Sequence, residues 1–235
     1  MPDTSIHKGH RERLKKRFLE EGLDSFTDIQ VLELLLFYCI PRQDTNPLAH
    51  RLLDTFGSLE AVLQASPKEL KKVEGVSDGV ADYLTMFRSV ARFCRIHEAQ
   101  AAKILKSVED CGNYLLPHFY NLCRETVYLL CLDAKCQVLC CKKLGEGSVN
   151  TAAVPIRRIV EMALEEGASV VVLAHNHPSG VAVPSGDDVQ TTRRLAIALD
   201  AVGVELLDHI VVAEGEFVSL LQSGYYDPKQ CRLLV

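Results

Sequence analysis

The chain has 235 residues, of which 48% are hydrophobic, and a formal net charge of -5 at neutral pH. This length and apolar content allow one large or two small domains with a real core. The negative charge excludes a protein whose whole surface attracts nucleic acid, so any such binding would be local. The longest apolar stretches are far shorter than the roughly 18 residues that a membrane span needs, so we expect no membrane anchor.

The N-terminal stretch MPDTSIHK lacks the apolar segment of a signal peptide, and we therefore expect a cytoplasmic protein without disulfides. The nine cysteines are an odd number and form no Cys-x-x-Cys pair. Four of them lie in apolar runs that resemble strands: Cys131, Cys136, Cys140 and Cys141. Buried free thiols are the favoured interpretation, and a zinc cluster built on cysteine is the alternative.

Residues 7–100 are predicted to form helices joined by short turns, because apolar residues recur at helical spacing and no segment alternates like a strand. The run SPKE at 66–69 is a typical helix start, and Gly57 and Gly75 are typical helix stops. We expect an all-α domain over residues 1–105, joined to the rest of the chain within HEAQAAKILKS.

From about residue 107 the pattern changes to strands and helices in alternation. A short helix over 107–119 is followed by two apolar runs, TVYLLCLD and CQVLCCKKL, which predict a hairpin that turns at Ala134-Lys135. A helix, a buried strand, a second helix and a further strand then follow, over about 155–166, 169–175, 186–201 and 204–213. This order predicts an α/β domain over residues 106–235 with helices packed on a sheet, and hence a two-domain α+β protein.

Two histidines stand at the end of the predicted strand 169–175, in the segment LAHNHPSGVAVPSGDDVQ. In an extended backbone His175 and His177 point to the same side, about 6.5 Å apart at Cα, so both imidazoles can bind one ion. The turn that follows places Asp188 in the first turn of the next helix, able to fold back over the histidines. A catalytic zinc ion typically has three protein ligands and a water, so these three residues are the candidate metal ligands.

Part of the same segment has a purely structural interpretation. Ser185 followed by Asp188 is close to a capping box at a helix start, which needs no metal. A histidine at a strand end is also more often a hydrogen-bonded core or surface residue than a ligand. The conjunction of two histidines, a rigid turn, a serine and an aspartate favours a metal site, and the cap role does not exclude it.

The spacing from His175 and His177 through Ser185 to Asp188 matches the signature of the JAMM (MPN+) metalloprotease superfamily. More narrowly, the chain resembles the bacterial RadC family, which is often labelled as a DNA repair family. This narrower resemblance extends over nearly all 235 residues. It rests on the motifs GHRERLKKRF, ELLLFYCIPRQDTNPLAHRLLDTFGSL, LGEGSVNTAAV, LAHNHPSG with PSGDD, and LLDHIVV.

The resemblance implies a JAB/MPN domain of the cytidine-deaminase-like kind, a mixed sheet flanked by helices, in which His175, His177 and Asp188 hold one Zn²⁺ ion. It also implies that Glu146, in KLGEGSVN, is the general base toward a water, although a solvated loop acid is an equal explanation for this residue. In the same pattern Ser185 donates a hydrogen bond to the developing oxyanion. A cap serine accepts from the backbone, so we expect its O–H proton to be free for that task.

The pair Asp208 and His209 lies in an apolar predicted strand. The favoured interpretation is that neighbouring groups within the sheet hold His209. In that case His209 is not a metal ligand itself and at most forms a hydrogen bond to one.

In the helical half, VEGVSDGVA resembles the helix-hairpin-helix pattern, whose Gly-x-Gly turn offers backbone N–H groups to a DNA phosphate. Here Ser77 replaces the second glycine, and Glu74 and Asp78 add negative charge, which argues against phosphate binding. The run HKGHRERLKKRF is a better candidate for DNA, although a solvated helix face is the more common explanation. Its basic residues are Lys8, Arg11, Arg13, Lys15, Lys16 and Arg17.

The first functional hypothesis is a zinc-dependent hydrolase of peptide or isopeptide bonds. The alternative is a DNA repair or recombination accessory protein that binds DNA through the helical half and has a non-catalytic metal site. A metal-dependent nuclease ranks last, because the cluster of carboxylates that holds two metals is missing. Base deamination is disfavoured, because the Pro-Cys-x-x-Cys element of those enzymes is absent.

Overall fold

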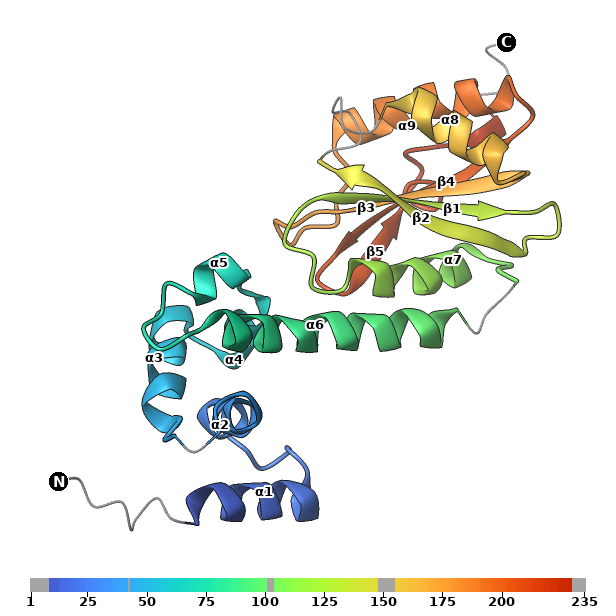
Figure 1. Cartoon of the computed structure of the whole chain (residues 1–235). Coiled ribbons are helices and arrows are strands. Elements are labelled where there is room, and N and C mark those ends of the chain that lie inside the picture. The colour runs from blue at the N-terminus through green and yellow to red at the C-terminus, as the bar shows by residue number, and fades with distance from the viewer. Residues whose placement is uncertain (1–8, 42, 101–103, 148–154, 230–235) are drawn as a thin grey trace. The chain divides into compact units, whose positions relative to one another are not determined.

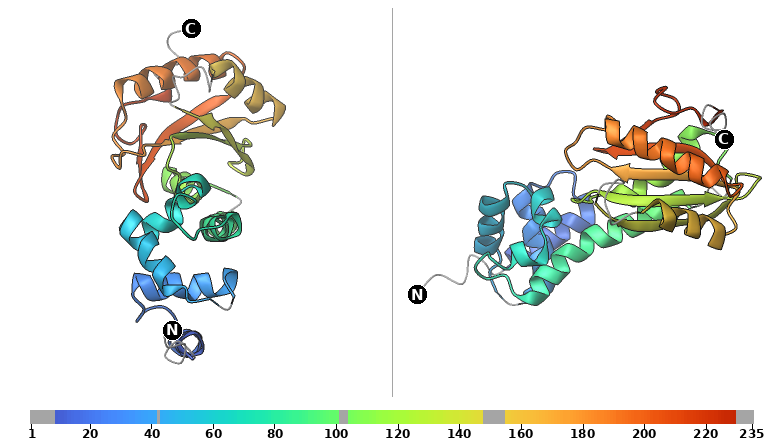
Figure 2. Two further views of the ribbon diagram at one scale, coloured as in Figure 1. Left: turned by 60° about the vertical axis from the view of Figure 1, so that its left-hand side comes forward. Right: turned by 90° about the horizontal axis from the view of Figure 1, so that it is seen from above.

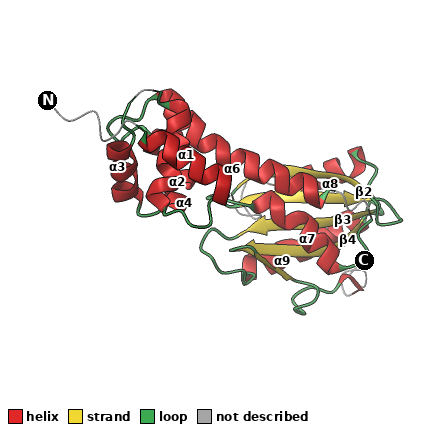
Figure 3. Ribbon diagram, turned by 90° about the horizontal axis from the view of Figure 1, so that it is seen from below, coloured by secondary structure: helices red, strands yellow, loops and turns green. Residues whose placement is uncertain are grey.

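The computed structural model describes residues 9–41, 43–100, 104–147 and 155–229. By its internal contacts the chain divides into two compact units, Met1–Ala91 and Arg92–Val235. Within the described ranges, named strands occur in the second unit alone and the first is helical, as the colours of Figure 3 show. The two-part α+β architecture is confirmed. The boundary expected at residue 105 stays a prediction, and the division between the units falls inside one long helix.

The first unit is a cluster of short helices around an apolar core. Leu32 and Leu36 are fully buried there against leucines of the neighbouring helices. Ser66 and Glu69 form the capping box that the run SPKE predicts, and Gly57 follows its helix with a positive φ of 88°. The elements are α1 (His10–Glu21), α2 (Asp28–Cys39), α3 (Asn46–Phe56), α4 (Leu59–Gln64), α5 (Pro67–Leu70) and α6 (Asp78–Ala99), whose second part belongs to the other unit.

The second unit is built on a five-stranded sheet in the order β2-β1-β3-β4-β5. β3 and β4 are parallel, and the other neighbours are antiparallel, so the sheet is mixed. Figure 1 shows α8 and α9 over one face of this sheet and α7 over the other. The elements are α7 (Val108–Leu115), η1 (Leu116–Phe119), β1 (Thr126–Leu132), β2 (Val138–Glu146), α8 (Ile156–Glu165), β3 (Val170–Asn176), α9 (Gly186–Asp200), β4 (Glu205–Ala213) and β5 (Glu216–Ser219).

The central strands are apolar throughout because both of their faces are covered. Leu129 of β1 and Leu173 of β3 pack against α8 and α9, whereas the next residues along, Leu130 and Ala174, pack against α7. All seven residues of β1 are buried. Strands buried on two sides show continuous apolar runs instead of alternation, which is the pattern of TVYLLCL and of VVVLA. The two further views in Figure 2 show the same layers around the sheet.

The β1–β2 hairpin is confirmed, and β5 is an element that the sequence analysis missed. β5 pairs with β4 through a two-residue turn of Glu214 and Gly215, both with positive φ. Such turns are most recognisable as Asn-Gly or Asp-Gly, so Glu-Gly before a strand of only four residues is a weak signal.

The cysteines of the hairpin are free thiols: Cys131 is buried, and Cys136, Cys140 and Cys141 are half-buried. Burial raises the pKa of Cys141 to about 12, so this thiol stays protonated in the metal-free protein. The groups of described residues that can hold a metal ion include no cysteine. Buried thiols are therefore the better interpretation within the described ranges. None of the helices described is both long and apolar enough to cross a membrane.

Candidate metal centre

The candidate centre lies where β3 ends beside β4 and β1. His175 is the next-to-last residue of β3, paired with Val211 of β4 and Val127 of β1, and its side chain is fully buried. His177 continues the extended backbone past the end of β3, since its N–H donates to the Val212 carbonyl at 2.8 Å. The two imidazoles therefore leave the backbone on the same side, as the period of two in a strand requires.

The chain then turns sharply and enters α9. Gly180 makes the turn with a φ of +86°, a backbone conformation that favours glycine. Ser185 caps α9 with the capping box that the sequence predicts, because its Oγ accepts from the Asp188 N–H at 3.1 Å. Asp188 thus stands in the first turn of α9 and points back toward the end of β3.

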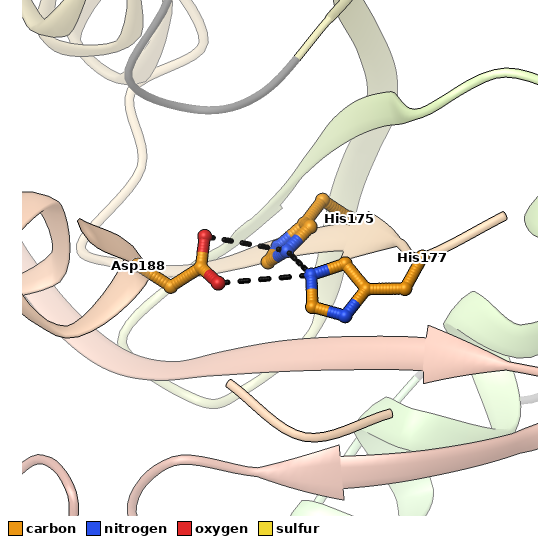
Figure 4. A group of neighbouring side chains, drawn as sticks. All are labelled: His175, His177 and Asp188. Atoms are coloured by element: carbon orange, nitrogen blue, oxygen red, sulfur yellow. Dashed lines mark hydrogen bonds and ion pairs between the residues drawn. The ribbon is translucent and has the colours of Figure 1, made fainter. Parts of the chain in front are cut away.

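Figure 4 shows the two imidazoles and the carboxylate pointing toward one another. His175 Nε2 lies 2.9 Å from His177 Nε2 and 3.4 Å from Asp188 Oδ1. His177 Nε2 lies 3.6 Å from Asp188 Oδ2. Ligands of a tetrahedral zinc site with bonds of about 2.0–2.1 Å are about 3.3 Å apart, so the three observed separations are near the size of such a site. The predicted ligand triad is brought together.

The hydrogen bond on the far side of the His177 ring decides which of its nitrogens faces His175 and Asp188 with a lone pair. His177 Nδ1 lies 2.9 Å from the Val181 carbonyl, which can only accept, so the proton of a neutral His177 is on Nδ1 and its Nε2 presents a lone pair. That lone pair faces His175 Nε2 and the Asp188 carboxylate. Such groups repel one another unless a proton or a metal ion lies between them, and two nitrogens with one carboxylate oxygen are suited to zinc.

The protonation state of His175 agrees with a ligand role. Burial lowers the pKa of His175 to about 4; Asp188 raises it by a smaller effect, and His177 lowers it further. The imidazole is therefore neutral at physiological pH, as metal binding requires. His209 Nε2 of β4 lies 2.8 Å behind it at His175 Nδ1. The interpretation of His209 as a buried residue that supports a ligand is thus in agreement with the geometry.

The expectation that the Ser185 hydroxyl proton is free is wrong. Ser185 Oγ lies 2.6 Å from Asp188 Oδ2, and the Ser185 N–H donates to the same oxygen at 2.8 Å. Because the Oγ also accepts from the Asp188 backbone, its one proton points to the carboxylate. The serine therefore orients the Asp188 carboxylate.

Glu146, the predicted general base, is the last residue of β2 and is half exposed. Its carboxylate pairs with Lys143 Nζ at 2.9 Å and Arg124 Nη1 at 3.2 Å, and it is not in the group that gathers His175, His177 and Asp188. Hydrogen bonds from Lys143 and Arg124 lower the pKa of Glu146, which makes it a weaker base.

Glu125, one residue before β1, is the acid that the sequence analysis did not single out. Val127 of β1 pairs with His175 of β3 at the end of the ladder, and the same antiparallel register continued by two residues brings Glu125 across from His177. Burial raises the pKa of the Glu125 carboxyl, with His177 lowering it and Asp188 raising it. The signal in the sequence was only an acid next to an apolar strand, because the register with β3 is needed to bring it to the site.

Asn176 connects these parts of the site. Its Oδ1 accepts from the Thr126 N–H at 2.9 Å, and its Nδ2 donates to the Arg124 carbonyl at 3.2 Å. The side chain is buried, so these bonds hold the backbone on both sides of Glu125 to the end of β3.

The basic residues of α1 are largely engaged within the first unit. Arg11 donates to the carbonyls of Phe37 and Ile40 at the end of α2, and Arg17 donates to Ser25. Lys16 pairs with Glu20 at 3.7 Å. Lys15 lies over the Tyr38 ring and Arg13 is exposed, whereas Lys8 is outside the described residues. The DNA-binding role of this run stays a prediction.

The turn that resembles a helix-hairpin-helix element is an ordinary helix start in this structure. Ser77 Oγ accepts from the Val80 N–H at 3.3 Å, and Asp78 pairs with Lys71 at 2.9 Å. Ser77 is not among the residues with positive φ, whereas Gly75 has a φ of 95°. The serine therefore serves the helix, and phosphate binding there has no additional support.

The comparisons with known proteins agree with this geometry. Residues 105–225 match the family model described as a RadC-like JAB domain. The chain is similar to a UPF0758 protein of Ruegeria pomeroyi, at 34% identity over 94% of this chain and 99% of that protein. A UPF0758 protein of Rhodobacter capsulatus is 36% identical over 90% of this chain and 99% of its own length. A UPF0758 protein of Fusobacterium nucleatum is 31% identical over 93% of this chain and 97% of its own length. The fold, the convergent His-His-Asp group and these matches together show that the chain belongs to the RadC family, with a RadC-like JAB domain of the JAMM/MPN type.

Proposed function

We propose that this protein is a zinc-dependent hydrolase of peptide or isopeptide bonds, in which His175, His177 and Asp188 hold one Zn²⁺ ion. The observation that carries the proposal is the convergence of two imidazole Nε2 atoms and one carboxylate, 2.9 to 3.6 Å apart, at the end of β3. A zinc ion in such a site supplies a Lewis acid that polarises a carbonyl and makes water more acidic.

In this proposal Glu125 moves the proton. Its carboxylate accepts a proton from the attacking water and returns it to the leaving amine nitrogen, as a general base and then a general acid. The support is its register position opposite His177 and the burial that raises its pKa toward the working pH. Glu146 is the weaker candidate for the same task, because Lys143 and Arg124 already bind its carboxylate.

Ser185 and Asn176 have supporting tasks. Ser185 holds Asp188 Oδ2 through both its hydroxyl and its N–H, which fixes the carboxylate toward the histidines. Asn176 holds the backbone around Glu125 against β3. Positioning of this kind matters because a reacting group displaced by about 1 Å loses much of its rate advantage.

The test is a comparison of the wild type with Glu125→Gln and Glu146→Gln, each loaded with zinc, on peptide and isopeptide substrates. Glu125→Gln should retain zinc and lose about 10²- to 10⁴-fold in hydrolysis, the range that general acid–base catalysis contributes. Glu146→Gln should keep most of its activity. A purified wild-type protein that takes up no zinc, even from zinc-supplemented medium, would overturn the proposal, and the reverse order of the two variants would return the base to Glu146.

The alternative, a DNA-binding accessory protein, has less support. Arg11 and Arg17 use their donors on backbone carbonyls of the helical unit, and the chain carries a net charge of -5. DNA binding that weakens with salt and is unchanged in His175→Ala would favour it.

A further inference from the structure

A chain of buried hydrogen bonds extends behind His175 and returns to Asp188. His175 Nδ1 lies 2.8 Å from His209 Nε2, and His209 Nδ1 lies 2.6 Å from Thr192 Oγ1. Thr192 Oγ1 lies 2.6 Å from the Asp188 carbonyl oxygen, one turn earlier in α9. His175, His209 and Thr192 have no exposed surface. The chain therefore connects β3, β4 and α9 through side chains that water does not reach.

The direction of these bonds is decided at the threonine. The Asp188 carbonyl can only accept, and a hydroxyl has one proton, so Thr192 donates that proton to the carbonyl. Its oxygen is then left to accept, and the donor facing it must be the Nδ1–H of His209. The tautomer of His209 follows from an interaction with the backbone of α9.

The same reasoning then gives the tautomer of His175, the candidate metal ligand. A neutral imidazole has one N–H, so a His209 protonated at Nδ1 presents a lone pair at Nε2. His175 must donate to that lone pair from its own Nδ1. The remaining nitrogen, His175 Nε2, therefore carries a lone pair and faces His177 and Asp188.

The opposite direction is unfavourable for a reason in the same contacts. If His175 were protonated at Nε2, His209 would have to donate from Nε2 and accept at Nδ1, and Thr192 would give its proton to His209. Thr192 Oγ1 and the Asp188 carbonyl oxygen would then be 2.6 Å apart without a proton between them, in a buried place. Two oxygens that face each other at this distance with no proton between them repel, so this direction is disfavoured.

We propose that Thr192 and His209 are positioning residues that hold His175 in the Nδ1-protonated form, so that its Nε2 is ready to bind the metal ion before the ion arrives. The inference rests on the metal-binding part of the proposed function and not on hydrolysis. Asp188 takes part twice: its carboxylate faces the ion site, and its backbone carbonyl sets the direction of the hydrogen bonds through Thr192 and His209.

The first experiment uses the metal-free, full-length wild type and ¹⁵N NMR of the histidine side chains. The expected spectrum shows His175 and His209 protonated at Nδ1. Protonation of His175 at Nε2 would overturn the proposal directly, and this measurement needs no variant. The measurement does not depend on hydrolysis. A protein that shows the expected tautomers but hydrolyses no substrate would therefore contradict the proposed hydrolase activity and leave the inference about the tautomers intact.

The second experiment compares Thr192→Val with Thr192→Ser as its matched control. Valine has the shape of threonine without the hydroxyl, whereas serine keeps the hydroxyl. Thr192→Val should lose the Nδ1 tautomer of His209 and weaken zinc binding about 10- to 100-fold in a chelator competition, as is typical for residues behind metal ligands. Thr192→Ser should restore both. Equal zinc affinity and equal tautomers in Thr192→Val and the wild type would overturn the proposal.

Discussion

The two units differ in how their buried polar side chains are used. In the second unit His175, Asp188, Thr192 and His209 are all buried and bonded to one another at one end of β3. In the first unit the two buried polar residues that the structure describes are not bonded to each other: Glu33 pairs with the half-exposed His10 at 3.4 Å, and the Thr45 hydroxyl has no hydrogen-bond partner among the described residues.

This difference separates a connected polar group in the second unit from isolated ones in the first. Burying a polar group is unfavourable unless it is hydrogen-bonded, so a connected group of them is kept in place by its own bonds and can present a defined arrangement. The helical unit keeps its structure through leucine packing and through arginines that bond to backbone carbonyls. The expected effects of substitution differ accordingly, and they are largest in the second unit.

The largest effect is expected for Asp188→Asn in the second unit. The change keeps the capping position and the backbone carbonyl but removes the charge from the ligand triad. We expect zinc affinity to fall by more than the 10- to 100-fold that is typical of a residue behind a ligand. Titration of the metal-free protein with zinc in a calorimeter measures it. Asp187→Asn, an exposed neighbour in the same helix, is the control, and equal losses in the two variants would contradict the assignment of Asp188.

Asn176→Ala tests the connection between β3 and Glu125. The change leaves the Thr126 N–H without its partner in a buried place, which costs about 1–3 kcal/mol of unfolding free energy. Hydrolysis should fall while zinc binding is nearly retained, because the three ligands keep their own hydrogen bonds. Urea unfolding and zinc titration separate the two effects, and a variant that loses zinc as fully as Asp188→Asn would show that Asn176 acts on the ligands instead.

The third prediction concerns how the stability of the second unit depends on pH. Burial, with a smaller effect of Arg92, lowers the pKa of His118 from 6.5 to about 4. Below the ordinary pKa the unfolded chain takes up a proton that the folded one does not, so stability is lost as the pH falls from 6.5 toward 4. The slope due to one such group is at most about 1.4 kcal/mol per pH unit.

His118→Phe should remove that share of the slope, since the ring lies against Tyr114 and Tyr128 and a phenyl ring can take its place. Urea unfolding at several pH values measures it. His50→Phe changes an exposed histidine of the helical unit and serves as the control. If both variants keep the wild-type slope, burial of His118 does not contribute to the acid sensitivity.

The smallest effect is expected in the helical unit. Arg11→Ala removes the donors to Phe37 and Ile40 at the end of α2 and should cost about 1 kcal/mol, because this partly exposed arginine is screened by solvent. Arg13→Ala, which changes an exposed residue of the same helix, should have little effect on unfolding. Salt-dependent DNA binding that falls equally in both variants, with unchanged stability, would instead support a nucleic-acid surface on α1.

Much of the site could be predicted because it depends on short segments. His175 and His177 share a side through the period of a strand, and the cap formed by Ser185 with Asp188 follows from four consecutive residues. What was missed depends on contacts between distant segments. Glu125 reaches the site through the register of β1 with β3, and β5 was hidden by a short strand and an uncommon turn.

The sequence by itself determined the order of helices and strands, the His-x-His turn and the helix cap, because periodicity, turn residues and capping are local properties of the backbone. Only the tertiary structure decided which acid stands beside the ligands and how His209 and Thr192 bond behind His175. These features depend on β1, β3, β4 and α9 meeting at one end of the sheet. Hydrogen-bond direction between distant residues exists only once they are packed together.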